Sequence, residues 1–146
     1  MTEKKPETGL TIGQLSKATG CKVPTIRYYE EIGLMPPARR SRGNQRLYGQ
    51  RELDRLSFIR HSRELGFSQA AIRELLRMTD APERPCEDAD RIAQEQLEAV
   101  ERKLSRLEAL RDELTRMVRQ CEGGRIADCR VIEVLADHKE CRTAQH

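Results

Sequence analysis

The sequence is poor in aromatic side chains: it has no tryptophan, two phenylalanines and three tyrosines in 146 residues, while 35% of its residues are charged. This composition argues against one large globular core and predicts a small domain joined to an extended helical element. No apolar stretch is long enough to span a bilayer, and the first ten residues lack the apolar centre of a signal peptide. We therefore expect a cytoplasmic protein that has no membrane partner.

Cysteines are few and odd in number. They are Cys21, Cys86, Cys121, Cys129 and Cys141. In a cytoplasmic protein, this count favours thiols or metal ligands over a disulfide framework. The sequence also lacks a nucleophile paired with a base and a nucleotide-binding loop, so we do not expect an enzyme.

Charge is distributed unevenly along the chain, although the net charge is only +3. Residues 1–80 hold 15 Lys and Arg against 9 Asp and Glu, whereas the remainder holds 12 against 15. A basic N-terminal half joined to a helical second half predicts a polyanion partner at one end and a protein partner at the other.

The first helices have local start and stop signals. Thr11 and Gln14 form a capping-box pattern for a helix over Ile12–Thr19, and Gly20 supplies its end. Pro24 suits the first turn of a second helix, and the spacing of Tyr29 from Ile26 and Ile32 predicts that Tyr29 packs in the core. Cys21, in the turn before this helix, is also expected to be buried. Two helices joined by a tight turn have helix-turn-helix spacing, with an ordinary helical hairpin as the alternative.

A basic segment follows the two helices. Residues 39–48 contain four arginines around a Gly-Asn turn between short extended arms, which indicates a small wing. Two amphipathic helices, expected over residues 50–65 and 68–78, would support the first two helices and the wing.

One long helix is expected over residues 88–120, and its apolar positions form a seam for pairing with a second helix. These positions are Leu97, Val100, Leu104, Leu107, Leu114 and Val118. Cys86 and Cys121 lie at opposite ends of this helix, about 50 Å apart in one chain. Antiparallel pairing of two copies would bring Cys86 of one chain beside Cys121 and Cys129 of the other.

The three cysteines predict a metal site. Gly123 and Gly124 allow the loop after Cys121 to fold back toward Cys129. Three thiolates leave one net negative charge around a divalent ion and two around a monovalent ion, and the larger charge costs more to bury. We therefore expect zinc, cadmium, lead or mercury, with His138 and Cys141 as candidate accessory ligands. A copper(I) site and a thiol sensor of oxidants or electrophiles are the alternatives.

Four motifs carry a family resemblance. They are Thr11-Ile12-Gly13-Gln14-Leu15, Thr25-Ile26-Arg27-Tyr28-Tyr29-Glu30, Gly33-Leu34 and Arg46-Leu47-Tyr48. In these motifs, and in the long helix and cysteine loop, the chain resembles the metal-sensing branch of the MerR family of transcriptional regulators. The resemblance implies a homodimer that binds palindromic promoter DNA. It also implies activation of RNA polymerase by DNA distortion, and a divalent metal where a cysteine precedes the long helix.

The resemblance also implies roles for individual residues. Thr25, Arg27 and Tyr28 would lie on or beside the recognition helix. Arg40, Arg46 and Tyr48 would hold phosphates from the wing. Base edges are best reached from exposed positions early in the second helix, which adds Lys22 to Thr25 as a candidate.

Together these features predict a mainly α fold with three parts. A winged helix-turn-helix DNA-binding domain with its supporting helices would occupy residues 1–80. A linker and a long antiparallel coiled-coil dimerisation helix would occupy residues 81–120. The cysteine metal-binding loop, a short helix and a tail would occupy residues 121–146. The expected function is metal-responsive transcriptional regulation.

Overall fold

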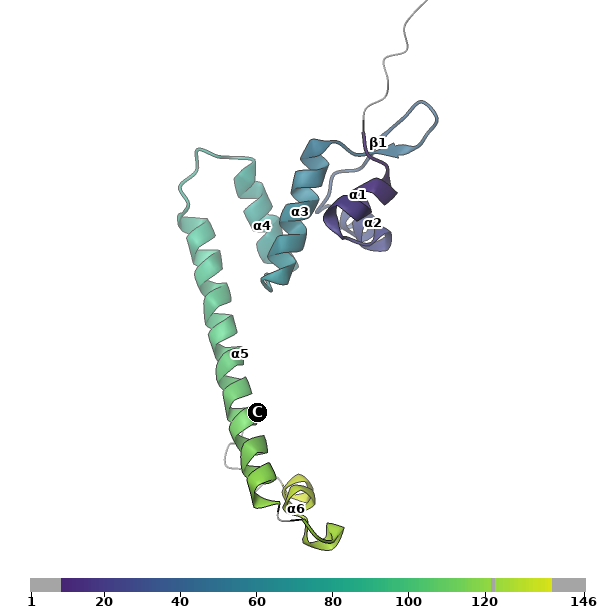
Figure 1. The fold of residues 1–146 in the computed structure, drawn as a ribbon. Coiled ribbons are helices and arrows are strands. Elements are labelled where there is room, and N and C mark those ends of the chain that lie inside the picture. The colour runs from purple at the N-terminus through teal and green to yellow at the C-terminus, as the bar shows by residue number, and fades with distance from the viewer. Residues whose placement is uncertain (1–8, 122, 138–146) are drawn as a thin grey trace, which may run out of the picture. The chain divides into compact units, whose positions relative to one another are not determined.

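The computed structural model describes residues 9–121 and 123–137. The described residues are mainly helical, as the sequence predicts (Figure 1). They fall into two compact units that divide between Ala89 and Asp90. No helix within the described ranges is long and apolar enough to cross a membrane.

The first unit contains four helices and a short hairpin. In chain order these elements are α1 (Ile12–Thr19), α2 (Val23–Glu31), β1 (Arg39–Arg40), β2 (Arg46–Leu47), α3 (Gln50–Glu64) and α4 (Gln69–Thr79). Helix α1 contacts both α2 and α3, and α3 contacts α4. The observed bounds agree with the predicted ones to within one or two residues.

Local hydrogen bonds fix the ends of α1. The Thr11 hydroxyl accepts from the Gln14 backbone N–H at 3.2 Å, while the Gln14 side chain accepts from the Thr11 N–H at 2.9 Å, which confirms the capping box. Gly20 ends the helix with φ of 72°, a left-handed conformation that glycine adopts without strain. This glycine makes the tight turn between α1 and α2.

The core of the first unit is built from one face of each helix. Its buried members are Leu15, Cys21, Ile26, Tyr29, Leu34, Met35, Tyr48, Leu56, Ile59, Ile72 and Leu76. Burial of Cys21 and Tyr29 confirms that both pack as core residues. The packing fixes the two faces of α2, because its buried side holds Ile26 and Tyr29 and its other side faces solvent.

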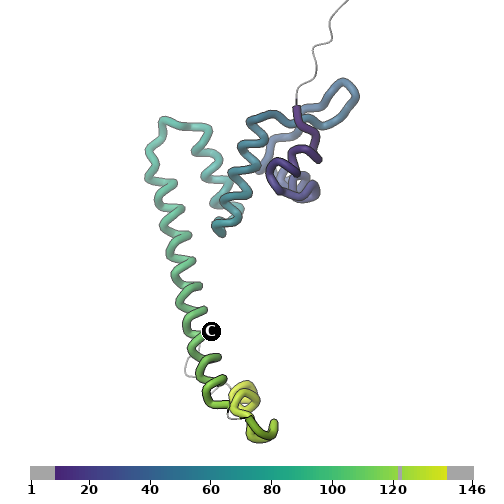
Figure 2. Tube along the Cα trace, in the orientation of Figure 1, coloured from purple at the N-terminus to yellow at the C-terminus, as the bar shows by residue number. Residues whose placement is uncertain are grey.

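The wing is a two-stranded antiparallel hairpin, whose backbone can be followed in Figure 2. Arg39 pairs with Leu47 and Arg40 pairs with Arg46. Asn44 lies in the turn with φ of 64°.

The second unit consists mainly of α5 (Glu87–Gln120), the 3₁₀ helix η1 (Ile126–Asp128) and α6 (Arg130–Ala136). Helix α5 begins at the end of the first unit and runs for 34 residues, as predicted from its apolar repeat. Ile92, Met117 and Val134 are buried. In contrast, all six seam residues named above are exposed, so in a single chain the apolar seam of α5 has no cover.

Candidate nucleic-acid interface and metal-binding loop

The solvent-facing side of α2 carries most of the predicted DNA-contacting residues. Lys22 occupies the N-cap position of α2, and it is exposed together with Arg27. Tyr28 is 44% exposed, and its hydroxyl accepts from the Gln69 amide at 3.3 Å. Thr25 is half-buried on the first turn. The helix therefore presents two cations and a phenol to the solvent.

Side chains from α3 and α4 hold the backbone on both sides of this surface. Arg73 donates to the Ile32 carbonyl and Arg55 donates to the Leu34 carbonyl, each at 2.7 Å. Arg60 donates to the Thr19 carbonyl at the end of α1. These charge-assisted bonds satisfy carbonyls at helix ends and restrain α2 against the supporting helices.

The wing places its arginines in two different environments. Arg40 is exposed, and its guanidinium donates to the Asn44 carbonyl at 3.0 Å across the hairpin. Arg46 is partly exposed and forms an ion pair with Glu30 of α2 at 3.1 Å. Arg40 is therefore accessible to a polyanion, whereas Arg46 already has a carboxylate partner.

Tyr48 does not have the exposure that its predicted phosphate contact requires. Its side chain is 0% exposed, and its hydroxyl donates to a Glu30 carboxylate oxygen at 2.5 Å. Its backbone is held by a bridge to the segment before α1, because Leu10 and Tyr48 exchange hydrogen bonds of 2.7 and 2.8 Å. The Tyr48 ring lies in the buried core cluster of the first unit, and its neighbour Leu47 is buried as well. The geometry corrects the role of Tyr48 from phosphate contact to packing.

Glu30 is a residue that the sequence reasoning missed. Its side chain is only 11% exposed, and its two carboxylate oxygens accept from Tyr48 and Arg46. Burial and then the Glu30 hydrogen bond raise the pKa of Tyr48 from 10.0 to about 12. The arrangement ties the wing to α2. No local pattern signals these contacts, because the partners of Glu30 lie 16 and 18 residues later in the chain.

The cysteine loop brings two thiols together at its base. Cys121 follows directly after α5, and Cys129 is the N-cap of α6. Between them Gly123 and Gly124 adopt φ of 78° and 106°, which lets the chain reverse direction. The Cys121 thiol donates a hydrogen bond to the Cys129 sulfur. Loop folding therefore places two soft sulfur donors side by side.

The environment of Cys129 lowers the pKa of its thiol. Backbone N–H groups of Ile132 and then Val131 donate to its sulfur and lower the pKa of Cys129, with a smaller contribution from Cys121. A thiolate is both the metal-binding and the nucleophilic form of cysteine. Cys121 and Cys129 are thus chemically suited to hold a soft metal ion.

Cys86 is exposed and lies directly before α5. The 34 residues of that helix correspond to about 50 Å of axis. Across residues 9–121 and 123–137 of a single chain, no three His, Cys, Asp or Glu side chains form a cluster able to hold a metal ion. The accessory candidates His138 and Cys141 lie outside the described residues.

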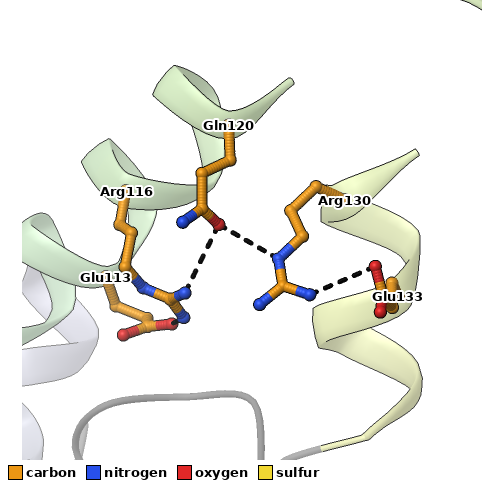
Figure 3. Close-up of polar contacts among 5 residues, drawn as sticks. All are labelled: Glu113, Arg116, Gln120, Arg130 and Glu133. Atoms are coloured by element: carbon orange, nitrogen blue, oxygen red, sulfur yellow. Dashed lines mark hydrogen bonds and ion pairs between the residues drawn. The ribbon is translucent and has the colours of Figure 1, made fainter. Parts of the chain in front are cut away.

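A polar cluster that the sequence reasoning also missed connects α5 to α6 beside the two thiols (Figure 3). The Gln120 amide oxygen accepts from Arg116 at 3.4 Å and from Arg130 at 3.0 Å. Arg116 contacts Glu113, and Arg130 pairs with Glu133 at 3.1 Å. The Gln120–Arg130 bond joins residues ten apart across a glycine loop, so no helical spacing signals it, whereas the other contacts of the cluster have i,i+3 or i,i+4 spacing.

Family models match most of the chain. A model of the MerR HTH family regulatory proteins matches residues 10–79, and a model described as MerR, DNA binding matches residues 53–117. The two matches overlap in α3 and α4, and together they run from the capping box of α1 to the last turns of α5.

Individual relatives match over nearly the whole chain. The heavy metal-dependent transcription regulator 2 of Rhizobium meliloti (strain 1021) is 36% identical over 128 residues, which cover 88% of this chain and 87% of the relative. The transcription regulator PbrR691 from Ralstonia metallidurans CH34, solved in complex with lead(II), superposes with a TM-score of 0.74 at 36% identity, covering 86% of this chain and 98% of that one. MerR from Bacillus megaterium MB1, solved in complex with mercury(II), superposes with a TM-score of 0.67 at 31% identity. The superposition covers 88% of this chain and 100% of that one. The chain belongs to the MerR family of helix-turn-helix transcriptional regulators.

Proposed function

We propose that this protein is a metal-responsive transcriptional regulator that acts in the cytoplasm as a homodimer on promoter DNA. The observation that carries the proposal is the pair of hydrogen-bonded thiols, Cys121 and Cys129, at the end of a long helix whose other end carries Cys86. Relatives described as heavy metal-dependent, or solved with lead(II) or mercury(II), support the same conclusion. Family members are regulators, so the protein is not an enzyme.

DNA binding is assigned to the exposed side of α2 and to the wing. Lys22 and Thr25 are proposed to contact base edges, because they lie on the first turn of the recognition helix. Arg27, Tyr28 and Arg40 are proposed to contact phosphates, which positions the helix without reading sequence. Arg46 could also contact a phosphate, but its guanidinium would have to bind the phosphate and Glu30 at the same time.

Dimerisation is assigned to the exposed apolar seam of α5. Seam residues recur at intervals of three, four and, once, seven residues, which is the pattern of a helix that packs along its length against another helix. Antiparallel pairing of two α5 helices would cover both seams and place Cys86 of the partner subunit near Cys121 and Cys129. The three-thiol site would then exist only in the dimer.

Charge favours a divalent ion at this site. A bound divalent metal ion would supply two positive charges against three thiolates, which leaves one net negative charge to be stabilised. Zinc, cadmium, lead and mercury are the candidates by softness. Two thiols without Cys86 would instead suit copper(I), which is the first alternative.

A second alternative is a sensor of oxidants or electrophiles. The lowered pKa of Cys129 and its contact with Cys121 favour this chemistry too, because neighbouring thiols can be oxidised to a disulfide. The two functions differ in what changes transcription: a metal ion under reducing conditions, or an oxidant that dithiothreitol reverses.

Activation is proposed to act through DNA shape. In this proposal the dimer binds the promoter both with and without metal, but its two DNA-binding domains are arranged differently in the two states. The metal-loaded arrangement bends and untwists the promoter. RNA polymerase would then engage the distorted promoter. Coupling of this kind requires tighter metal binding to one of the two arrangements.

The test uses a DNA duplex selected from a random library by the protein itself, placed in a promoter. Cys121→Ser and Cys129→Ser are expected to keep duplex affinity and lose metal-induced transcription, whereas the loop control Ala127→Ser keeps both. Zinc, cadmium, lead, mercury and copper(I) are titrated separately under reducing conditions. A wild-type response to none of them, or loss of duplex binding in both cysteine variants, would contradict the proposal.

A further inference from the structure

The residues that flank the two loop thiols are bonded to each other. Gln120 directly precedes Cys121, Arg130 directly follows Cys129, and the Arg130 Nε–H donates to the Gln120 amide oxygen at 3.0 Å. Figure 3 shows this amide oxygen between the guanidinium groups of Arg116 and Arg130. One side-chain hydrogen bond therefore closes the segment that carries both sulfurs.

Further contacts hold each half of this bond in place. On α5, Arg116 donates to the same Gln120 oxygen at 3.4 Å and contacts Glu113, whose side chain is 5% exposed. On α6, Arg130 pairs with Glu133 at 3.1 Å. The Gln120 amide and the Arg130 guanidinium thus have restrained rotamers, which lowers the entropy cost of the bond between them.

The charges of this cluster decide what it can do for a metal site. Two arginines and two glutamates cancel, so the cluster supplies no net positive charge against metal-bound thiolates. Its effect is mechanical. A Cβ added at Gly123 or Gly124 would meet no atom within 4 Å, so these two residues make no close packing contact that would hold the ends of the loop together. A hydrogen bond at the base of the loop therefore adds to the burial of Val134 on α6 in keeping the two sulfurs close.

We propose that Gln120 and Arg130 form a latch that keeps Cys121 and Cys129 paired before metal arrives. The inference rests on the proposed function in one respect, namely that these two thiols hold the metal ion. The latch residues touch no metal and act as positioning residues. Preorganisation of a donor pair raises affinity for any soft ion, because less ordering remains for the binding step.

The first readout is thiol proximity in the metal-free, reduced protein, measured without any metal. Diamide accepts one thiolate at its N=N bond, and the second thiolate attacks that sulfur, so an S–S bond forms, two thiols are oxidised and diamide is reduced to the hydrazine. In a Cys86→Ser background, mass mapping follows the Cys121–Cys129 bridge alone. Gln120→Met and Arg130→Met are each expected to slow its formation about fivefold, the factor that corresponds to one hydrogen bond.

The second readout is cadmium affinity of the full chain with Cys86 present, measured by competition with a chelator. The same two variants are expected to bind cadmium about fivefold more weakly. The double variant should lose no more cadmium affinity than either single variant, because each single substitution already removes the one bond that the two residues share. Glu133→Gln keeps that bond and should resemble wild type. Gln94→Met and Arg102→Met on the exposed surface of α5 are matched controls.

The outcomes separate the latch from the proposed function. Slower bridge formation in both variants, with no cadmium binding by wild type, would support the latch and contradict the metal function. Cadmium binding by wild type, with bridge rates and affinities equal in all variants, would overturn the latch alone. If the losses of cadmium affinity from the two single variants add in the double variant, the latch would also be overturned, since the two residues would then act separately.

Discussion

Tyr48→Phe removes one hydroxyl from the core of the DNA-binding domain and keeps the ring. The hydroxyl is fully buried and donates at 2.5 Å to Glu30, a carboxylate that is itself 11% exposed. A hydrogen bond to a charged group contributes about 2 kcal/mol, which for a domain of this size lowers the melting temperature by about 10 °C. We expect this loss in urea and thermal unfolding at about pH 8, followed by circular dichroism.

The same bond predicts how stability depends on pH. The pKa of Tyr48 is raised from 10.0 to about 12, so between these values the folded protein holds a proton that the unfolded chain has lost. The stabilisation is therefore complete below pH 10 and is lost as pH rises to about 12, by about 1.4 kcal/mol per pH unit. The phenylalanine variant lacks this titration.

The measurement is the difference in unfolding free energy between wild type and Tyr48→Phe across this range. Wild type should be the more stable protein at about pH 8, and the two curves should converge above pH 12. Equal stability at about pH 8, or parallel curves through the alkaline range, would refute the buried bond to Glu30. The salt dependence of DNA binding should not change, because Tyr48 contacts no phosphate in this account.

Three further predictions concern the proposed surfaces. Arg27→Ala and Arg40→Ala should each weaken binding to all duplexes and reduce the slope of log affinity against log salt by about one. The control Arg102→Ala on α5 should change neither the affinity nor the slope, and anisotropy titrations at several salt concentrations measure both. Leu107→Glu should place a charge in the apolar seam and shift the protein to monomer in sedimentation velocity, while Leu65→Glu, at the exposed C-cap of α3, leaves the dimer intact. Cys86→Ser should weaken the zinc and cadmium responses and permit a copper(I) response, and an unchanged metal profile would remove Cys86 from the site.

The parts of the fold that sequence predicted are those fixed by local interactions. Thr11, Gln14 and Gly20 set the bounds of α1 within a few residues of chain, and the apolar repeat of α5 is visible over many turns. Periodicity also identified Tyr29 as a core residue. These signals are short-range, so one sequence contains them in full.

The features that sequence did not predict depend on contacts between distant elements. Tyr48 follows a basic wing and is predicted to be exposed, but its backbone pairs with Leu10 and its ring packs in the core. Glu30 meets residues 16 and 18 positions later, which no helical or strand period predicts. Gln120 and Arg130 meet only because the glycine loop reverses the chain. Such pairings follow from tertiary packing and not from local pattern.

The central claim is that one metal site takes Cys86 from one subunit and Cys121 and Cys129 from the other. Mixing two impaired proteins tests it directly: one chain carries Cys86→Ser, and the other carries Cys121→Ser with Cys129→Ser. A mixed dimer would rebuild one complete three-thiol site, so cadmium titration should show one tight site per mixed dimer, with a higher affinity and a stronger thiolate absorption than either homodimer shows. A mixture that binds cadmium no more tightly than its two components would contradict the shared site.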